Sequence, residues 1–242
     1  MIIHGQKVTN LTQETTLYVV RHGQTMFNLL DRAQGWADSP LTPAGEEAAA
    51  QLGLGLSRSG VVFSAAWSSD SGRARDTGRI LLDHMGQQAL PLHTDRRLRE
   101  WCLGDMEGLP NRQFLSSLLG RDGRPISIRE LNARLPEAVE SIHTHLDSTG
   151  MSESYDTLRA RLLEGLFSIA RETAGQGGGN VLVVSHALSI KLLIHLLCPD
   201  RMEEATMLHN ASVCRFRFAD DGFQALELND TRYQDGSAVP AR

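Results

Sequence analysis

The stretch TTLYVVRHGQTMFN (residues 15–28) runs from a short apolar segment directly into an arginine, a histidine and a glycine. Residues 16–20 have the β-branched and aromatic composition of a buried strand, which ends by Gly23. A second stretch, NVLVVSH (residues 180–186), has the same design and ends on His186. Strands without polar alternation are buried on both faces, so these two predict a mostly parallel sheet with helices on both sides.

Helical and extended patterns alternate along the rest of the chain, which predicts an α/β fold: a three-layer α/β/α sandwich with a mostly parallel central sheet. Thr42 and Ser152 are placed to cap two of the helices, and the glycines of 175–179 to end one. We expect helices over 43–56, 71–85, 152–174 and 187–198, further strands over 61–69 and 89–94, and a hairpin around 220–222.

The domain organisation follows from the segments that do not fit this alternation. Residues 1–15 have no apolar core of a signal peptide and are expected to form a flexible leader. Residues 16–242 are expected to form a single domain, because no low-complexity linker divides them. Residues from about 105 to 150 are rich in arginine and punctuated by glycine and proline, and we expect a helical lid inserted there.

Composition narrows the function classes. The formal net charge of −5 gives no general attraction for nucleic acid or an anionic membrane, and no apolar run has the length of a membrane span. Three cysteines outside any CxxC pattern argue against a disulfide framework or a thiolate metal site. A cytoplasmic location is therefore expected, and an anion site requires a local cluster of cations.

Such a cluster is predicted at one edge of the sheet. Ligands of parallel sheets bind beyond the carboxyl ends of the strands, where both apolar strands deliver a histidine. If the strands are neighbours, His22 and His186 share a pocket. Arg21 and Arg73 nearby would repel a metal ion, but guanidinium groups match the oxygens of a phosphoryl group. The pattern favours a phosphate site.

Several blocks of the sequence, in this order, resemble the motifs of the histidine phosphatase superfamily, in the branch of cofactor-dependent phosphoglycerate mutases and related phosphatases. They are LYVVRHGQTMFN (17–28), SSDSGRARDT (68–77), LREWCLGDMEG (98–108) and VLVVSHA (181–187). Two departures stand out. Ala187 replaces the usual glycine, so a slightly different turn is expected there, and Gln24 replaces the commoner glutamate.

The resemblance implies a role for each catalytic candidate, without a metal ion or other cofactor. His22 would be the nucleophile that becomes a phosphohistidine, Glu100 the acid and base, and Arg21, Arg73 and His186 would surround the phosphoryl oxygens. The family's substrate contacts fall on Gly23, Gln24, Thr25, Asn28, Gln34 and Gly35.

Two of these assignments have competitors in the sequence itself. Glu107 could replace Glu100 as the acid, although Glu100 directly follows "RLR", as the family acid does. Arg73 could be an ordinary helix-surface arginine that pairs with Asp76 or Asp70.

The expected function is a metal-independent phosphatase that hydrolyses a small phosphorylated metabolite through a phosphohistidine. The alternative within the superfamily is a phosphoglycerate mutase, whose region between the acid and the second histidine carries an arginine pair; residues 111–150 contain only single arginines. A non-catalytic phospholigand-binding protein is the alternative of another class, and it should lack one of the five catalytic candidates. The sequence leaves open whether the chain forms homo-oligomers.

The role of the arginines in the predicted lid has two possible explanations. These single arginines either recognise another anionic group of the substrate or form a solvated basic face. They are Arg112, Arg121, Arg124, Arg129 and Arg134.

Overall fold

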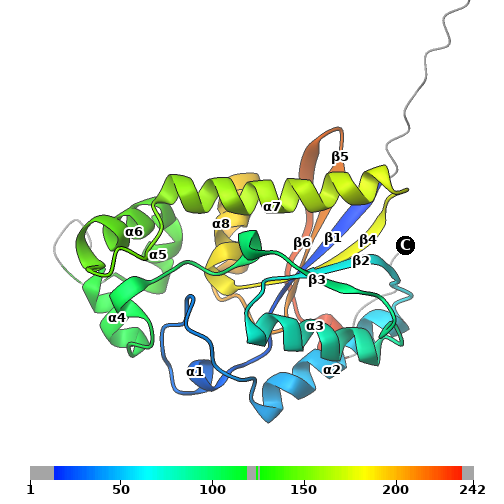
Figure 1. Ribbon diagram of the computed structural model, residues 1–242, viewed down its shortest axis with the longest axis horizontal. Helices are drawn as coiled ribbons and strands as arrows, with labels where there is room; N and C mark the ends of the chain where they lie inside the picture. Colours follow the sequence, from blue (N-terminus) through cyan, green and yellow to red (C-terminus); the bar gives the residue numbers. More distant parts are fainter. Residues whose placement is uncertain (1–13, 119–123, 125, 236–242) are drawn as a thin grey trace, which may run out of the picture.

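A six-stranded sheet lies at the centre of the structure, a computed structural model that describes residues 14–118, 124 and 126–235 (Figure 1). In the order β3-β2-β4-β1-β5-β6, the first four strands pair in parallel, and β5 is antiparallel to both β1 and β6. Only β5 opposes the common direction, so the prediction of a mostly parallel sheet is confirmed. The strands are β1 (Thr15–Arg21), β2 (Phe63–Ser68), β3 (Leu92–Thr94), β4 (Gly179–Ser185), β5 (Val213–Ala219) and β6 (Gly222–Asp230).

Helices cover both faces of this sheet. The α-helices are α1 (Met26–Leu29), α2 (Pro43–Arg58), α3 (Gly72–His84), α4 (Asn111–Ser117), α5 (Ile128–Ala133), α6 (Leu135–Ser141), α7 (Tyr155–Gly175), α8 (Ala187–Leu197) and α9 (Arg232–Asp235). Short 3₁₀ segments are η1 (Arg96–Leu98), η2 (Gly104–Met106) and η4 (Pro199–Ala205), and the π-helical turn η3 is Ile142–Leu146.

The alternation of side chains along β1 explains its apolar sequence. Leu17 and Val19 belong to the core formed with α7 and α8, whereas Tyr18 and Val20 belong to a second core with α2 and α3. Successive residues of a strand point to opposite faces, so a strand covered on both sides must be apolar throughout. The three-layer prediction is confirmed.

Helices α4, α5 and α6 form the insertion that the sequence predicted as a lid. They lie together at one end of the molecule, to the left in Figure 1, and α7 leads from them across one face of the sheet. Some of the described residues of α4 and α5 line a cavity of the site described below, and residues 119–123 and 125 lie outside the described part of the chain.

Helix boundaries agree with the predictions except at one cap. Thr42 caps α2, since its Oγ1 accepts a hydrogen bond from the Gly45 amide at 3.0 Å. Ser152 does not cap α7; Ser154 does, with the Thr157 amide as donor. The backbone of Ser152 is committed to the preceding turn, where its amide donates to Asp147 at 2.8 Å.

Strand β1 begins at the last residue of the predicted leader, residues 1–15. Thr15, which we placed in the leader, is the first residue of β1 and is fully buried. Residues 1–13 lie outside the described part of the chain. Within that part, no helix is long and apolar enough to cross a membrane.

Candidate active site

The pairing of β1 with β4 brings the two strand-terminal histidines together. Arg21 lies opposite Ser185 in the register, and the His22 amide donates to the Ser185 carbonyl at 3.1 Å. The imidazole rings that follow are 5.3 Å apart between centroids and inclined by 59°. Both side chains are buried, with 4% and 1% of their surface exposed for His22 and His186.

His22 has one ring nitrogen engaged and one available. Its Nδ1 lies 2.8 Å from the Gly23 carbonyl oxygen, which can only accept, so Nδ1 carries the proton. Burial lowers the pKa of His22 well below its ordinary value, and the charges of Arg73 and Arg21 lower it further. The ring is therefore neutral at physiological pH, and Nε2 has a free lone pair with which to attack an electrophile.

His186 has a different environment. Neither of its ring nitrogens has a hydrogen-bond partner among the residues the structure describes. Burial lowers the pKa of His186 well below its usual range, with smaller contributions from Arg73 and His22. A buried polar ring without partners is costly unless a ligand completes it, and an N–H donor here suits an anionic oxygen.

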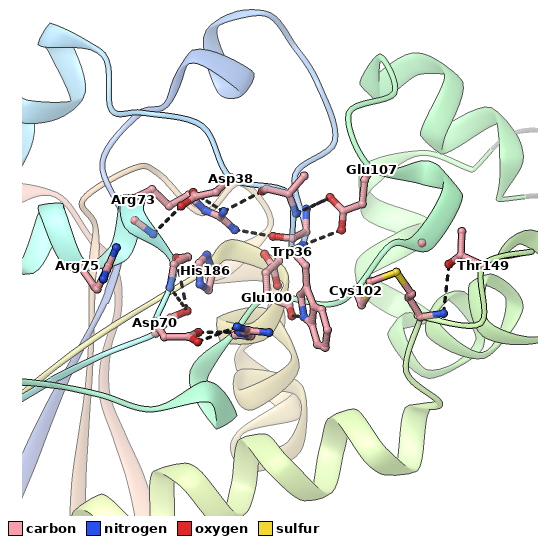
Figure 2. Close-up of a pocket in the computed structure, with 18 residues that line it drawn as sticks. Trp36, Asp38, Asp70, Arg73, Arg75, Glu100, Cys102, Glu107, Thr149 and His186 are labelled. Carbon is pink, nitrogen blue, oxygen red and sulfur yellow. Dashed lines mark hydrogen bonds and ion pairs between the residues drawn. The ribbon is translucent and has the colours of Figure 1, made fainter.

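Arg73 is held rigidly beside the histidines. It is 1% exposed, and its terminal nitrogens donate to the Gly35 carbonyl at 2.7 Å and to the Asp38 carboxylate at 2.9 Å (Figure 2). The alternative of a helix-surface arginine is wrong, because Asp70 pairs with Arg99 and Asp76 with Arg79.

Arg21 supplies a second, half-buried cation. Its terminal nitrogen donates to the Leu208 carbonyl, and its Nε is buried without a partner in the described ranges. Burial lowers the pKa of Arg21 to about 10, partly offset by the attraction of Glu100. The guanidinium thus remains charged at neutral pH and contributes positive potential where the histidines converge.

The two candidate acids occupy different environments. The Glu107 carboxylate accepts hydrogen bonds from four backbone amides, those of Gly35, Trp36, Ala37 and Leu103, and so fastens one loop to another (Figure 2). Glu100 is 4% exposed and accepts from the amides of Trp101, Leu188 and Ser189 and from the Ser189 hydroxyl. Glu100 lines both cavities described next, including the one that contains His22, whereas Glu107 lines only the other, and this favours Glu100 as the acid.

Two cavities meet at Glu100. One, of about 550 Å³, is lined by Trp36, Arg73, Cys102 and His186, and we call it the tryptophan cavity (Figure 2). The other, of about 740 Å³, we call the insertion cavity. Its lining includes Arg21, His22, Lys191 and side chains of α4 and α5. Glu100 lines both; Arg73 and His186 line the tryptophan cavity, and Arg21 and His22 line the insertion cavity.

The six predicted substrate contacts separate into two groups. Asn28 and Gln34 line the insertion cavity and Gly35 the tryptophan cavity. Gly23, Gln24 and Thr25 line neither of these two cavities. The Gly23 amide donates to Thr77, Gln24 accepts from Thr42, and Thr25 caps α1.

Close packing explains why residue 23 is glycine. A Cβ there would lie 2.5 Å from the Gly45 carbonyl oxygen at the start of α2. The motif glycine therefore lets α2 approach the strand end, which brings the backbone after His22 into its turn.

Sequence reasoning missed several residues that hold the candidates in place. Asn210 donates to the His22 carbonyl at 3.0 Å and to the Asn28 side chain at 3.1 Å. Arg161 on α7 pairs with Glu153 and donates to the Glu100 carbonyl at 2.8 Å, and Trp36 Nε1 donates to the same carbonyl. These contacts join segments distant in the chain, and no local motif marks them.

Comparison with known proteins accounts for this arrangement. The family model of the histidine phosphatase superfamily (branch 1) matches residues 17–231. The chain belongs to the histidine phosphatase superfamily.

Relatives within the superfamily include both phosphatases and mutases. A broad-specificity phosphatase of Saccharomyces cerevisiae, YOR283W, is 27% identical over 211 residues, covering 86% of this chain and 81% of its own. The 2,3-bisphosphoglycerate-dependent phosphoglycerate mutase of Allorhizobium ampelinum is 42% identical, but over only 39% of this chain and 44% of its own.

A solved structure extends the similarity over nearly the whole chain. The phosphoglycerate mutase of Bacillus anthracis superposes with a TM-score of 0.85 at 35% identity, covering 93% of this chain and 97% of that one. The fold and family are thus shared by proteins whose names record different reactions.

One of the two departures from the superfamily pattern has a simple structural account. Ala187 is the first residue of α8 and is not among the residues with positive φ, so that position does not require glycine. The Gln24 side-chain oxygen accepts from Thr42 Oγ1 at 2.8 Å, a bond that a glutamate oxygen could also accept.

Replacing Glu107 with alanine should lower the stability of the folded protein rather than remove a reacting group. The four amide donors would lose a charged acceptor, and we expect a loss of about 2–4 kcal/mol in the free energy of unfolding. Urea denaturation measures this loss. Glu164→Gln, at a carboxylate 72% exposed beside Arg97, is the matched control and should change the stability little. A Glu107→Ala protein of unchanged stability would contradict the structural role.

The buried histidines should make stability depend on pH in a defined direction. Their pKa values are lowered in the folded state, so below about pH 6.5 the unfolded chain binds protons that the folded chain does not. The free energy of unfolding should therefore be fully retained above this pH and should fall by about 1 kcal/mol per pH unit for each histidine between pH 6.5 and 5.

Denaturation of the wild type and of His186→Gln across this pH range tests the effect. The variant should show a shallower slope, because one of the two groups is gone. Equal slopes would contradict the lowered pKa of His186.

Proposed function

We propose that this protein is a metal-independent phosphatase that hydrolyses phosphomonoesters through a phosphohistidine on His22. The observation that carries the proposal is the nearness of a neutral, tautomer-fixed His22 to a His186 whose ring nitrogens have no hydrogen-bond partner among the described residues, together with the buried Arg73 and the half-buried Arg21. Such a set offers one nucleophile and several donors for phosphoryl oxygens.

In the first step Nε2 of His22 attacks phosphorus in line with the leaving oxygen. The N–P bond forms as the P–O bond to the leaving group breaks, and Glu100 in its acid form gives the departing oxygen a proton. Arg21, Arg73 and His186 donate to the remaining oxygens and stabilise their charge, since guanidinium groups match phosphoryl geometry. The alcohol leaves and His22 retains the phosphoryl group.

The second step regenerates the enzyme. Glu100, now a carboxylate, accepts a proton from water, whose oxygen attacks the phosphohistidine; the N–P bond breaks and phosphate departs. The amides of Leu188 and Ser189 donate to the Glu100 carboxylate, and the side chains of Arg161 and Trp36 donate to the Glu100 main-chain carbonyl. Together these hydrogen bonds hold the carboxylate in place for both steps.

A mutase is the second candidate, supported by the mutase relatives and by the superposition at 35% identity. A mutase must retain the phosphoryl group of a bisphosphate and exclude water. Among the described residues, the wall that the insertion contributes to its cavity is mostly apolar (Phe114, Leu115, Ile126, Ile128 and Leu131), with Asn111, Arg112 and Ser116 as its polar members. This wall supports hydrolysis over retention of a second phosphoryl group.

One panel of substrates tests the proposal. The wild type should release phosphate from 4-nitrophenyl phosphate at the same rate with and without excess EDTA. With 2- and 3-phosphoglycerate, free phosphate and isomerisation are scored together. Isomerisation without phosphate release would favour the mutase, binding without either product would favour a phospholigand-binding protein, and loss of activity in EDTA would overturn metal independence.

A further inference from the structure

We propose that Lys191 binds a second anionic group of the substrate, a carboxylate, so that the substrate class is a phosphomonoester with an apolar body and a carboxylate. The inference rests on the proposed function, since it names the substrate of the same site. Lys191 lies on α8, one turn beyond the backbone amides that hold Glu100.

Lys191 is a buried cation in the wall of the insertion cavity. Its side chain is 6% exposed, and its Nζ donates to the Asn132 side-chain oxygen at 3.1 Å and to the Thr206 carbonyl at 2.9 Å. Asn132 belongs to α5 of the insertion and Thr206 follows η4, so the ammonium group lies where these segments meet α8. Lys191 and Arg21 both line the cavity.

The hydrogen-bond partners of Lys191 are neutral. An ammonium group has three donors, and the two hydrogen bonds go to the oxygens of Asn132 and Thr206. Within the described ranges no carboxylate is in direct contact with it, although buried lysines are usually paired. Burial, followed by the charge of Arg21, lowers its pKa to about 8, and the more distant charge of Glu100 offsets this in part, so at neutral pH most molecules carry the charge. A buried cation with neutral partners is suited to an anion that arrives with the ligand.

The surroundings indicate what carries that anion. Beside Lys191 the cavity is lined by Leu103, Phe114, Leu131, Leu188 and Leu208, which suit an apolar body between the two anionic groups. The ammonium group of Lys191 matches the single charge of a carboxylate, whereas a second phosphoryl dianion usually gathers several cations. Besides Arg21, the other cations among the described residues that line this cavity are Arg32 and Arg112, and both are exposed rather than buried beside Lys191.

Most arginines of the insertion are not placed to bind the carboxylate that we assign to Lys191. Among the five, Arg112 lines the cavity, Arg129 pairs with Glu203, Arg134 lies near Glu137 and Arg124 also has an interaction partner, while Arg121 falls outside the described residues. Arg112 is exposed, so a carboxylate bound at Lys191 would lie deeper in the cavity than one at Arg112.

Two ligands that differ only in charge test the inference. We would measure the Kd of 4-carboxyphenyl phosphate and of the isosteric, neutral 4-carbamoylphenyl phosphate, with the 3-substituted pair for a shorter reach. The His22→Ala background prevents turnover, and calorimetry reads binding directly. In at least one pair the carboxylate should bind about tenfold tighter or more, as expected for a buried charge-assisted contact.

Variants at position 191 separate charge from structure. Lys191→Gln keeps donors for Asn132 and Thr206 but removes the charge, and should abolish the preference, while Lys191→Arg should retain it. Arg129→Gln, which removes an exposed charge from the same insertion, should leave the preference unchanged. Thermal unfolding of each variant shows that the fold is intact.

The outcomes distinguish this inference from the proposed function. Equal affinities for both members of each pair, no binding of either, or a preference retained in Lys191→Gln would overturn the role of Lys191. If Lys191→Gln fails to fold, the comparison of carboxylate and carboxamide ligands on the His22→Ala protein, in which Lys191 is unchanged, decides alone. Phosphate release by the unaltered enzyme reports separately on hydrolysis, whichever way the affinities fall.

Discussion

Replacing His22 with alanine is expected to lower kcat/KM for aryl phosphates by roughly 10⁴- to 10⁶-fold, the loss typical of removing an enzyme's nucleophile. His186 follows a different strand, and its ring centroid is 5.3 Å from that of His22, so its nitrogens do not take the place of Nε2 of His22. Quenched reactions with ³²P-labelled substrate should trap an alkali-stable, acid-labile phosphoryl group on the wild type and none on the variant.

The control for this change is His84→Ala. His84 is an exposed histidine at the end of α3 whose Nδ1 contacts the Ile80 carbonyl, and its loss should leave both kcat and trapping unchanged. Substantial activity in His22→Ala, or a label trapped on that variant, would show that the nucleophile is another residue.

Replacing Glu100 with glutamine should produce a loss that depends on the leaving group. General acid catalysis contributes about 10²- to 10⁴-fold, so hydrolysis of an alkyl phosphate should fall by that factor. With 2,4-dinitrophenyl phosphate, whose leaving group needs no proton, the first step should stay fast while the attack of water on the phosphohistidine becomes slow. Stopped-flow absorbance should then show a burst of about one dinitrophenolate per enzyme.

The burst distinguishes the acid from a structural carboxylate. Glu107→Ala should lose stability and show no burst, since both steps would decline together with the loop that carries Gly35 and Ala37. Thermal unfolding of Glu100→Gln checks that the start of α8 is intact. Equal losses for both leaving groups without a burst would remove Glu100 from the chemistry.

Local pattern was sufficient for the layers of the fold and for part of the candidate site. Strands apolar on both faces require helices on both faces, and Thr42 and Pro43 mark the start of α2 because capping is local. The sequence predicted that His22 and His186 lie close together only if their two strands are neighbours in the sheet. The pairing of β1 with β4, in which Arg21 lies opposite Ser185, shows that they are.

Features set by distant contacts escaped the sequence. The anchoring of Arg73 by Asp38 and by the Gly35 carbonyl joins a loop to a helix, and no periodicity encodes it. The family motif marks Gln24 and Thr25 without stating whether their side chains face a ligand, and both serve helix caps. Lys191 did leave a trace, a lone cation in the apolar run of α8, but its meaning depends on α5 and η4 packing against it.

The position of β1 has a consequence for how the chain is made. Among the described strands β1 is synthesised before the others, and in the sheet it is flanked by β4 and β5, which lie within residues 179–219. Both of its edges therefore stay unpaired until those residues have been synthesised, and an apolar strand with open edges is prone to aggregate. Catalytic competence is correspondingly a late event in biogenesis: a nascent chain that stops before β4 already contains His22, yet it has no partner strand to hold that histidine beside His186.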